Sequence, residues 1–402
     1  MTVFKEKQVR ALRVAIAAGV AAALILPLGV AVAWNQLLDS QSATSVESSA
    51  ITIPDTPAAL VAGLGEGGQL SHLFVATLDA SGVGGTVVLV PIGAATEIQT
   101  VQADDAAEES SPQVSQRLAD VYATDGLGGL ANEVQGLLDV SFVAVGALSR
   151  VDLINLFAPL GGVDVLLDRE VVTVAVDGTP TRLASAGQES YPIDRVVDIL
   201  LARRPNEKES ERFARHREVW NGVVKRIGPG VEIPPETDTT PAGLVDANNF
   251  MRRVFGGALQ VWQLSAAPVL DKSLNPERAD MYSLDRAEVV MVFASVAPSA
   301  LSGVDLPVTV MIDSPFNDPV VSRAAVAVLL EAGVGVGIMR EVSAAEQSST
   351  LVAGDSEVTT ALQALLGESL GPIERISWEA PVAGIDAAIT LGSEFVASVR
   401  NK

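Results

Sequence analysis

Hydrophobic and polar residues recur with two different periods along most of this chain. From residue 57 onward, short apolar runs at 58–62, 73–78 and 86–91 are separated by Gly and Asp, which is typical of buried β-strands. Between such runs, apolar residues recur at the three- and four-residue spacing of an amphipathic helix. Strands interleaved with helices predict an α/β layered fold rather than a β-sandwich.

The same two periods predict the remaining elements. Further strands are expected at residues 142–145, 163–167 and 261–264, and helices at 115–122, 128–138, 150–157, 207–227 and 245–260. Residues 284–295 suit either a helix or a strand. Loop-like composition at 298–307 indicates a domain boundary, and a small α/β domain is expected after it. The strands of that domain are expected at 308–312, 335–340, 373–376 and 387–391, with helices at 320–332 and 357–366.

The N-terminal residues have the pattern of a membrane anchor. Residues 14–34 are uncharged, and about 20 apolar residues span a bilayer core as a helix. Basic residues in the tail 1–13 predict a cytoplasmic N-terminus, with the rest of the chain outside the cell membrane. The alternative is a cleaved signal peptide, because residues 31–33 match a small-x-small cleavage site ending at Ala33. Residues 35–56, rich in Ser, Thr and acidic residues, indicate a linker.

Composition excludes several classes of function. A net charge of −22 argues against a nucleic-acid partner, since such proteins neutralise phosphates with clustered Lys and Arg. The chain has no cysteine, which excludes disulfides, thiolate metal sites and cysteine nucleophiles. It has 2 histidines, so a His-rich metal site is excluded as well.

A cluster of arginines interrupts this acidic background at residues 202–217. Its members are Arg203, Arg204, Arg212, Arg215 and Arg217. Arginine forks suit phosphate oxygens, but local pairing is also expected on a helix, with Glu209 three residues before Arg212 and Glu211 four before Arg215. Residue chemistry alone favours the local pairing.

Two other motifs carry less information. Residues 63–68 have the spacing G-x-G-x-x-G, but an apolar strand follows where a dinucleotide site needs the start of a helix. His72 lies inside that apolar strand, and we expect it to be a hydrogen-bonded core residue.

Several segments together resemble one known family. Residues 209–216, ESERFARH, are similar to a D-x-x-R-x-x-R-Q helix motif, and 185–204 to a segment that ends in a pair of arginines. Residues 124–167 are similar to a glycine-led helix, a central strand and a Gly-Gly-Val strand entry. In this order, the segments resemble the LytR-CpsA-Psr (LCP) family of membrane-anchored cell-envelope phosphotransferases. Residues 308–336 and 385–395 resemble the LytR C-terminal module, although 313–317 replace its Asn-Gly-Thr turn.

This resemblance implies an architecture and a ligand. It implies an LCP-like α/β/α layered domain with a mixed central sheet at 57–300, and a LytR C-terminal-like domain at 305–402. Family enzymes transfer a glycopolymer from a lipid pyrophosphate carrier to peptidoglycan. By the resemblance, Arg203, Arg204, Arg212 and Arg215 would hold the pyrophosphate, and the helices at 128–138 and 150–157 are candidates to line a lipid-tail pocket.

The catalytic positions of the family are not retained. Gly65 and His72 stand at two of its aspartate positions, and Ile92 and Gly93 replace an Arg-Asp pair. Those carboxylates would bind Mg²⁺, and phosphoryl transfer depends largely on such charges. We therefore expect a degenerate cell-envelope protein without catalytic residues, metal or other cofactor, which binds a polyprenyl-linked glycan or an active LCP relative. The alternatives are an active, Mg²⁺-dependent phosphotransferase and a structural protein without a ligand.

Overall fold

The computed structural model describes residues 51–96, 115–174, 179–203, 207–231, 246–302, 306–343 and 347–401. The expected tail, membrane span and most of the linker, up to residue 50, lie outside these ranges. Within the described residues, every helix is too short or too polar for a membrane span.

The first sheet is mixed and has five strands in the order β4-β1-β2-β3-β9. Their bounds are β1 Ala58–Leu64, β2 Leu70–Leu78, β3 Gly85–Leu89, β4 Phe142–Leu148 and β9 Leu259–Gln263. β1, β2 and β3 pair antiparallel, whereas β4 and β9 pair parallel to β1 and β3 at the two edges. The predicted mixed sheet and its strands are thus confirmed.

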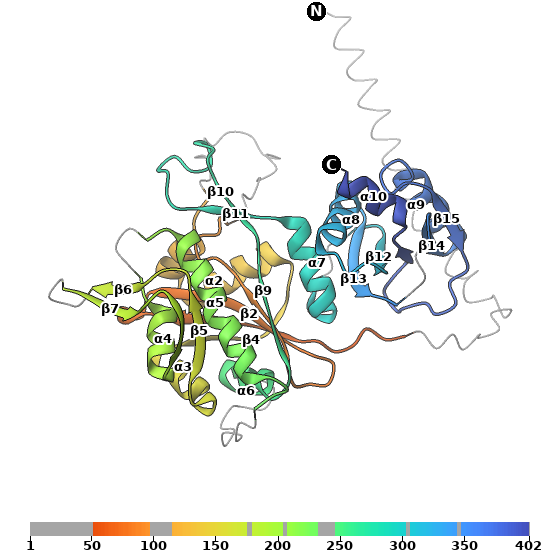
Figure 1. Cartoon of the computed structure of the whole chain (residues 1–402). Coiled ribbons are helices and arrows are strands. Elements are labelled where there is room, and N and C mark those ends of the chain that lie inside the picture. Colours follow the sequence, from red (N-terminus) through yellow and green to blue (C-terminus); the bar gives the residue numbers. More distant parts are fainter. Residues whose placement is uncertain are drawn as a thin grey trace, which may run out of the picture. The chain divides into compact units, whose positions relative to one another are not determined.

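Helices cover both faces of this sheet (Figure 1). They are α2 Leu118–Leu138, α3 Arg150–Phe157, α4 Ile193–Leu201, α5 Glu209–Ile227 and α6 Ala247–Phe255, whereas α7 Arg286–Val296 packs mainly against elements of the C-terminal domain. Leu60 and Ala62 of β1 pack in the same core as α2 and α7. Ala59 and Val61 pack on the other face, with α3 to α6. β1 is buried on both faces, which explains its unbroken apolar sequence.

Some predicted boundaries were wrong. The two helices expected at 115–122 and 128–138 are present as the two segments of α2, separated by a kink at Gly126 with a non-helical φ of 68°, but the first begins at Leu118 rather than at residue 115. α6 ends at Phe255 rather than at residue 260, because two glycines follow and the chain turns into β9. Residues 284–295 are chiefly helical, as α7.

The sequence patterns did not predict the bounds of α4 or the pairing of strands in three short two-stranded sheets. β5 Val163–Leu167 pairs with β8 Gly187–Tyr191, β6 Val171–Val174 with β7 Pro180–Ala184, and β10 Ala266–Pro268 with β11 Tyr282–Leu284. Of these, the expected strand at 163–167 is confirmed as β5. The β10–β11 hairpin lies beside the start of α5.

The C-terminal residues form a second mixed sheet in the order β13-β12-β16-β14-β15. Its strands are β12 Thr309–Ser314, β13 Gly335–Glu341, β14 Thr350–Gly354, β15 Ile373–Ile376 and β16 Ala387–Thr390, and its helices are α8 Pro319–Glu331, α9 Ser356–Leu366 and α10 Ser393–Arg400. The expected elements are present, whereas β14 and α10 were missed. Asp318 begins α8 by accepting hydrogen bonds from the N–H groups of Val320 and Val321, a regular N-cap.

α5 packs against the first domain with the face that its sequence predicts. Its buried side chains include Phe213, Val219, Trp220 and Val223. Gly222 lies so close to β5 that a Cβ there would stand 2.4 Å from the carbonyl oxygen of Asp164. This close approach fixes the distance between the helix and β5, and with it the positions of Arg215 and Arg212, about two and three turns earlier.

Candidate functional site

Two carboxylates, those of Glu209 and Asp280, hold the first turn of α5 in place. The side chain of Glu209 is buried and accepts a hydrogen bond of 2.9 Å from the N–H of Ile92, just after β3. The N–H of Glu209 itself donates to Asp280 Oδ2 at 2.6 Å. An acidic partner is favourable here because the N–H groups at the start of a helix carry partial positive charge.

Arg212 lies beneath this turn and is only 2% exposed. It donates to Glu209 from Nη2, while its Nε and Nη1 have no hydrogen-bond acceptor within the described residues. Burial lowers the pKa of Arg212, and the Glu209 charge partly opposes that effect. A buried guanidinium with two nitrogens that lack an acceptor is costly in free energy.

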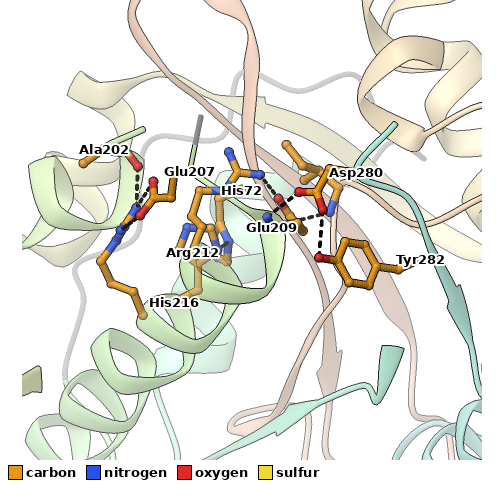
Figure 2. Close-up of polar contacts among 10 residues, drawn as sticks. His72, Ala202, Glu207, Glu209, Arg212, His216, Asp280 and Tyr282 are labelled. Carbon is orange, nitrogen blue, oxygen red and sulfur yellow. Dashed lines mark hydrogen bonds and ion pairs between the residues drawn. The ribbon is translucent and has the colours of Figure 1, made fainter. Parts of the chain in front are cut away.

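Arg215 uses its donors inside the protein. Its Nε donates to the carbonyl of Ile199 at 3.1 Å and its Nη2 to that of Ala202 at 2.5 Å, at the C-terminal end of α4. The same guanidinium forms a buried ion pair with Glu207. Figure 2 shows Ala202 and Glu207 on one side of Arg212, with Glu209, Asp280 and Tyr282 on the other. Arg215 therefore joins α4 to α5.

The four arginines expected at a ligand are thus in four different situations. Arg212 is buried, and Arg215 forms an ion pair with Glu207. Arg203 is exposed and forms no ion pair with a described residue, and Arg204 lies outside the described residues. Their proximity in sequence and the family resemblance had suggested a common role.

The expected local pairing is half confirmed. Glu209 pairs with Arg212, but Glu211 pairs with Arg169 at 3.0 Å instead of with Arg215. The reason is that α5 begins at Glu209, not at residue 207. The preceding extended residues bring Glu207 back over Arg215, and Glu211 is left on the outer face.

Two histidines and a tryptophan form a buried chain of hydrogen bonds behind Arg212. Trp220 Nε1–H donates to His72 Nε2 at 2.8 Å, so His72 carries its proton on Nδ1 and donates to His216 Nδ1 at 3.0 Å. Burial lowers the pKa of His72 to about 3, and burial with the nearby His72 and Arg212 lowers that of His216. Both rings are neutral at ordinary pH, and the prediction that His72 is a hydrogen-bonded core residue is confirmed.

The two glycines that the resemblance places at family aspartate positions differ in the room they leave for a side chain. A Cβ on Gly93 would lie 2.9 Å from the backbone carbonyl oxygen of Asp280, whereas one on Gly65 would chiefly meet the side chains of Ser71 and Gln69, which can move. Among the described residues, no group of three or more His, Asp or Glu side chains could hold a metal ion. These residues do not fit the Mg²⁺ site of the family.

The two helices expected to line one lipid-tail pocket do not share a face of the sheet. α2 packs in one core and α3 in the other. Beside α3, the rings of Phe74, Phe157, Trp220 and Phe255 lie 5.0 to 6.4 Å apart between centroids. That expectation was therefore wrong, because the central sheet separates the two apolar stripes.

Three residues that sequence reasoning missed complete the site. Asp280 lies on the segment between β10 and β11, where Tyr282 donates its hydroxyl to Asp280 Oδ1 at 2.9 Å. Arg117, just before α2, pairs with Asp120 through two bonds of 2.7 Å. The pKa of Arg117 is raised, mainly by Asp120 and to a lesser degree by Asp280 and Glu209. No local pattern indicates these residues, since Asp280 follows Glu209 by about seventy positions.

A hollow opens between the start of α5 and the β10–β11 hairpin. It has a volume of about 940 Å³. The cationic side chains that line it are Arg203, Lys208, Lys272 and Arg278. None of these four forms an ion pair with another described residue. Asp280 lines the same hollow and binds the helix start at its edge.

Comparison with known proteins gives matches among solved structures only. No family model matches the chain, and no curated protein does. TagV of B. subtilis is 12% identical, with 59% of this chain and 94% of that chain covered and a TM-score of 0.40. TagT of B. subtilis is 14% identical, with 59% and 88% covered and a TM-score of 0.37.

A third solved structure, described as a transcriptional regulator from Enterococcus faecalis, is 17% identical. The match covers 61% of this chain and 84% of that protein's chain, with a TM-score of 0.36. TagV and TagT are LCP-family enzymes. The chain is similar to them in fold. At such identities and TM-scores, the similarity assigns neither an activity nor a substrate.

Proposed function

We propose that this chain is a membrane-anchored, extracytoplasmic LCP-like protein that binds a polyprenyl-(pyro)phosphate-linked glycan and does not turn it over. The observation that carries the proposal is the hollow beside α5. It gathers four cations that form no ion pair with another described residue, in a protein of net charge −22. Phosphate oxygens are the ligands that such unpaired forks and ammonium groups bind best.

The hollow also has an apolar wall. Pro268, Val269 and Leu270 line it, and Leu270 is 84% exposed. An apolar surface next to cations suits the first isoprene units of a lipid whose pyrophosphate lies among the arginines. The predicted anchor at residues 14–34 would keep the hollow near the membrane that supplies such a lipid.

The lack of space at Gly93 favours binding over catalysis. A family aspartate at Gly93 would displace either Asp280 or Glu209, whose Cγ lies 3.4 Å from the site of that Cβ. Without preorganised charges, phosphoryl transfer loses about 10²–10³ in rate for each donor removed. The protein would then act in envelope assembly by presenting the lipid-linked glycan to an active relative.

The test uses the full chain in detergent with undecaprenyl pyrophosphate as the probe. We expect saturable, salt-sensitive binding, and no Mg²⁺-dependent release of phosphate. Arg203→Gln together with Lys272→Gln and Arg278→Gln should weaken binding at least tenfold, since one charge-assisted hydrogen bond contributes about 1.5–3 kcal/mol. Lys225→Gln, at the exposed far end of α5, is the control and should bind as the parent does.

Three outcomes would contradict the proposal. If the parent does not bind, or the triple variant binds equally well, the structural alternative without a ligand is favoured. Mg²⁺-dependent turnover by the parent would instead favour the active phosphotransferase.

A further inference from the structure

The start of α5 already holds an anion that belongs to the protein. Asp280 Oδ2 accepts the N–H of Glu209 at 2.6 Å, and Oδ1 accepts the hydroxyl of Tyr282 at 2.9 Å. Arg212, which pairs with the side chain of Glu209, is only 2% exposed. Two of its nitrogens, Nε and Nη1, have no acceptor among the described residues. A carboxylate of the protein therefore occupies the N–H of Glu209, the residue whose side chain accepts a hydrogen bond from Arg212.

The segment that carries Asp280 is attached at its base. Tyr282 donates its N–H to the carbonyl of Gly93 at 2.9 Å and accepts the N–H of Ala95 at 2.7 Å, which fixes β11 beside the chain that follows β3. A conformational change that frees Asp280 would therefore begin at residues 269–281, beyond this base, and leave the pairing with Gly93 and Ala95 in place.

Residues 269–281 are folded mainly around a single side chain. Asn275 is buried; its Nδ2 donates to the carbonyls of Val269 and Ala279 at 3.1 and 2.8 Å, and its Oδ1 accepts the N–H of Ala279 at 2.8 Å. Val269 also donates its N–H to the carbonyl of Met281 at 2.9 Å. These internal hydrogen bonds lie on both sides of Asp280 in the sequence, so a shift that frees Asp280 would open them.

The charges around Asp280 indicate what would replace it. Arg203 lines the hollow on the side of α5, while Lys272 and Arg278 lie on the same segment as Asp280. A pyrophosphate carries more negative charge than one carboxylate and has oxygens for several donors at once. It is therefore the better partner for this group of cations and for the helix start.

We propose that Asp280 is an internal competitor of the ligand, and that residues 269–281 must shift before a pyrophosphate reaches the N–H of Glu209 and the guanidinium of Arg212. This inference rests on the proposed function and adds its regulation. The closed arrangement described above is then the resting state, in which the affinity for free anions is low. Ligand entry exchanges the Asp280 carboxylate for a phosphate group at the same N–H.

The experiment titrates the full chain with inorganic pyrophosphate by calorimetry. Asp280→Asn keeps the shape and the acceptor for Glu209 N–H but removes the charge, and we expect it to bind pyrophosphate about tenfold more tightly than the parent. Tyr282→Phe, which removes one hydrogen bond to Asp280, should give a smaller gain. Glu277→Gln is the matched control, since Glu277 is exposed on the same segment and makes the same change in net charge.

The outcomes separate this inference from the proposed function. If the parent and Asp280→Asn bind equally, the competitor is refuted while ligand binding stands. An equal gain in Glu277→Gln would assign the effect to net charge and also refute it. If no variant binds pyrophosphate and the parent does not bind the lipid, both proposals fail.

Hydrogen exchange gives an independent readout. On binding of pyrophosphate, the amides of Val269 and Ala279 should exchange several-fold faster, while those of Tyr282 and Ala95 at the base should not change. Binding without any change in exchange at 269–281 would refute the displacement, whatever the affinities are.

Discussion

Arg215 offers the sharpest test of how the arginines of α5 are used. Its guanidinium donates to the carbonyls of Ile199 and Ala202 and pairs with Glu207. The side chains of Arg215 and Glu207 are 6% and 1% exposed. Replacement by methionine keeps most of the length of the side chain and removes every donor. We expect Arg215→Met to destabilise the fold, whether or not a ligand is present.

The size of the effect follows from burial. Removing one partner of a buried ion pair costs about 3–5 kcal/mol, because the other charge loses its compensation in a low-dielectric environment. Two carbonyl groups at the end of α4 lose a donor as well, and each such loss costs about 1–3 kcal/mol when water does not replace it. Since methionine partly refills the space, we expect a total loss of about 3–5 kcal/mol in the free energy of unfolding.

The measurement is urea denaturation followed by far-ultraviolet circular dichroism, with linear extrapolation to water. Arg217→Met is the matched control, because Arg217 lies two residues further on the same helix, is 52% exposed and pairs only with its neighbour Glu218. An exposed pair contributes about 0–1 kcal/mol. A loss below about 1 kcal/mol for Arg215→Met, or equal losses for both variants, would refute the structural role.

Two further predictions concern the core. Because the folded-state pKa of His72 is lowered from 6.5 to about 3 and that of His216 is also lowered, the unfolded chain binds more protons below pH 6.5. As the pH decreases from 6.5 to 5, each of the two histidines should then lower the free energy of unfolding by up to about 1.4 kcal/mol per pH unit. The slope should be shallower in His72→Phe/His216→Phe, and an unchanged slope would contradict this. At Gly222, alanine would place Cβ 2.4 Å from the Asp164 carbonyl oxygen and should lower thermal stability by about 1–3 kcal/mol. Gly136→Ala on α2 is the control, because a Cβ there has no neighbouring atom within 4 Å, and it should raise the free energy of unfolding by about 0.5–1 kcal/mol. A Gly222→Ala variant more stable than the parent would refute the close packing.

Much of the fold was predictable because it depends on local periodicity. The central strands β1, β2 and β3 are apolar on both faces, and this requires helices on both sides of the sheet. The buried stripe of α5 likewise follows from residues three and four apart. Gly126 and Gly256 were less visible, since the tertiary context decides whether a glycine bends a helix, ends it or does neither. Short edge elements such as β10 and β11 are only three residues long, too few to show a period.

The sequence by itself determined that basic residues gather near residue 210 and that His72 lies in a core strand. It did not determine what each arginine does. That depends on the start of α5 at Glu209, which turns Glu207 toward Arg215, and on Asp280, which reaches the same turn from a distant hairpin. Ion pairs depend on distances of a few ångströms between side chains, and only the tertiary structure sets such distances between segments far apart in the chain.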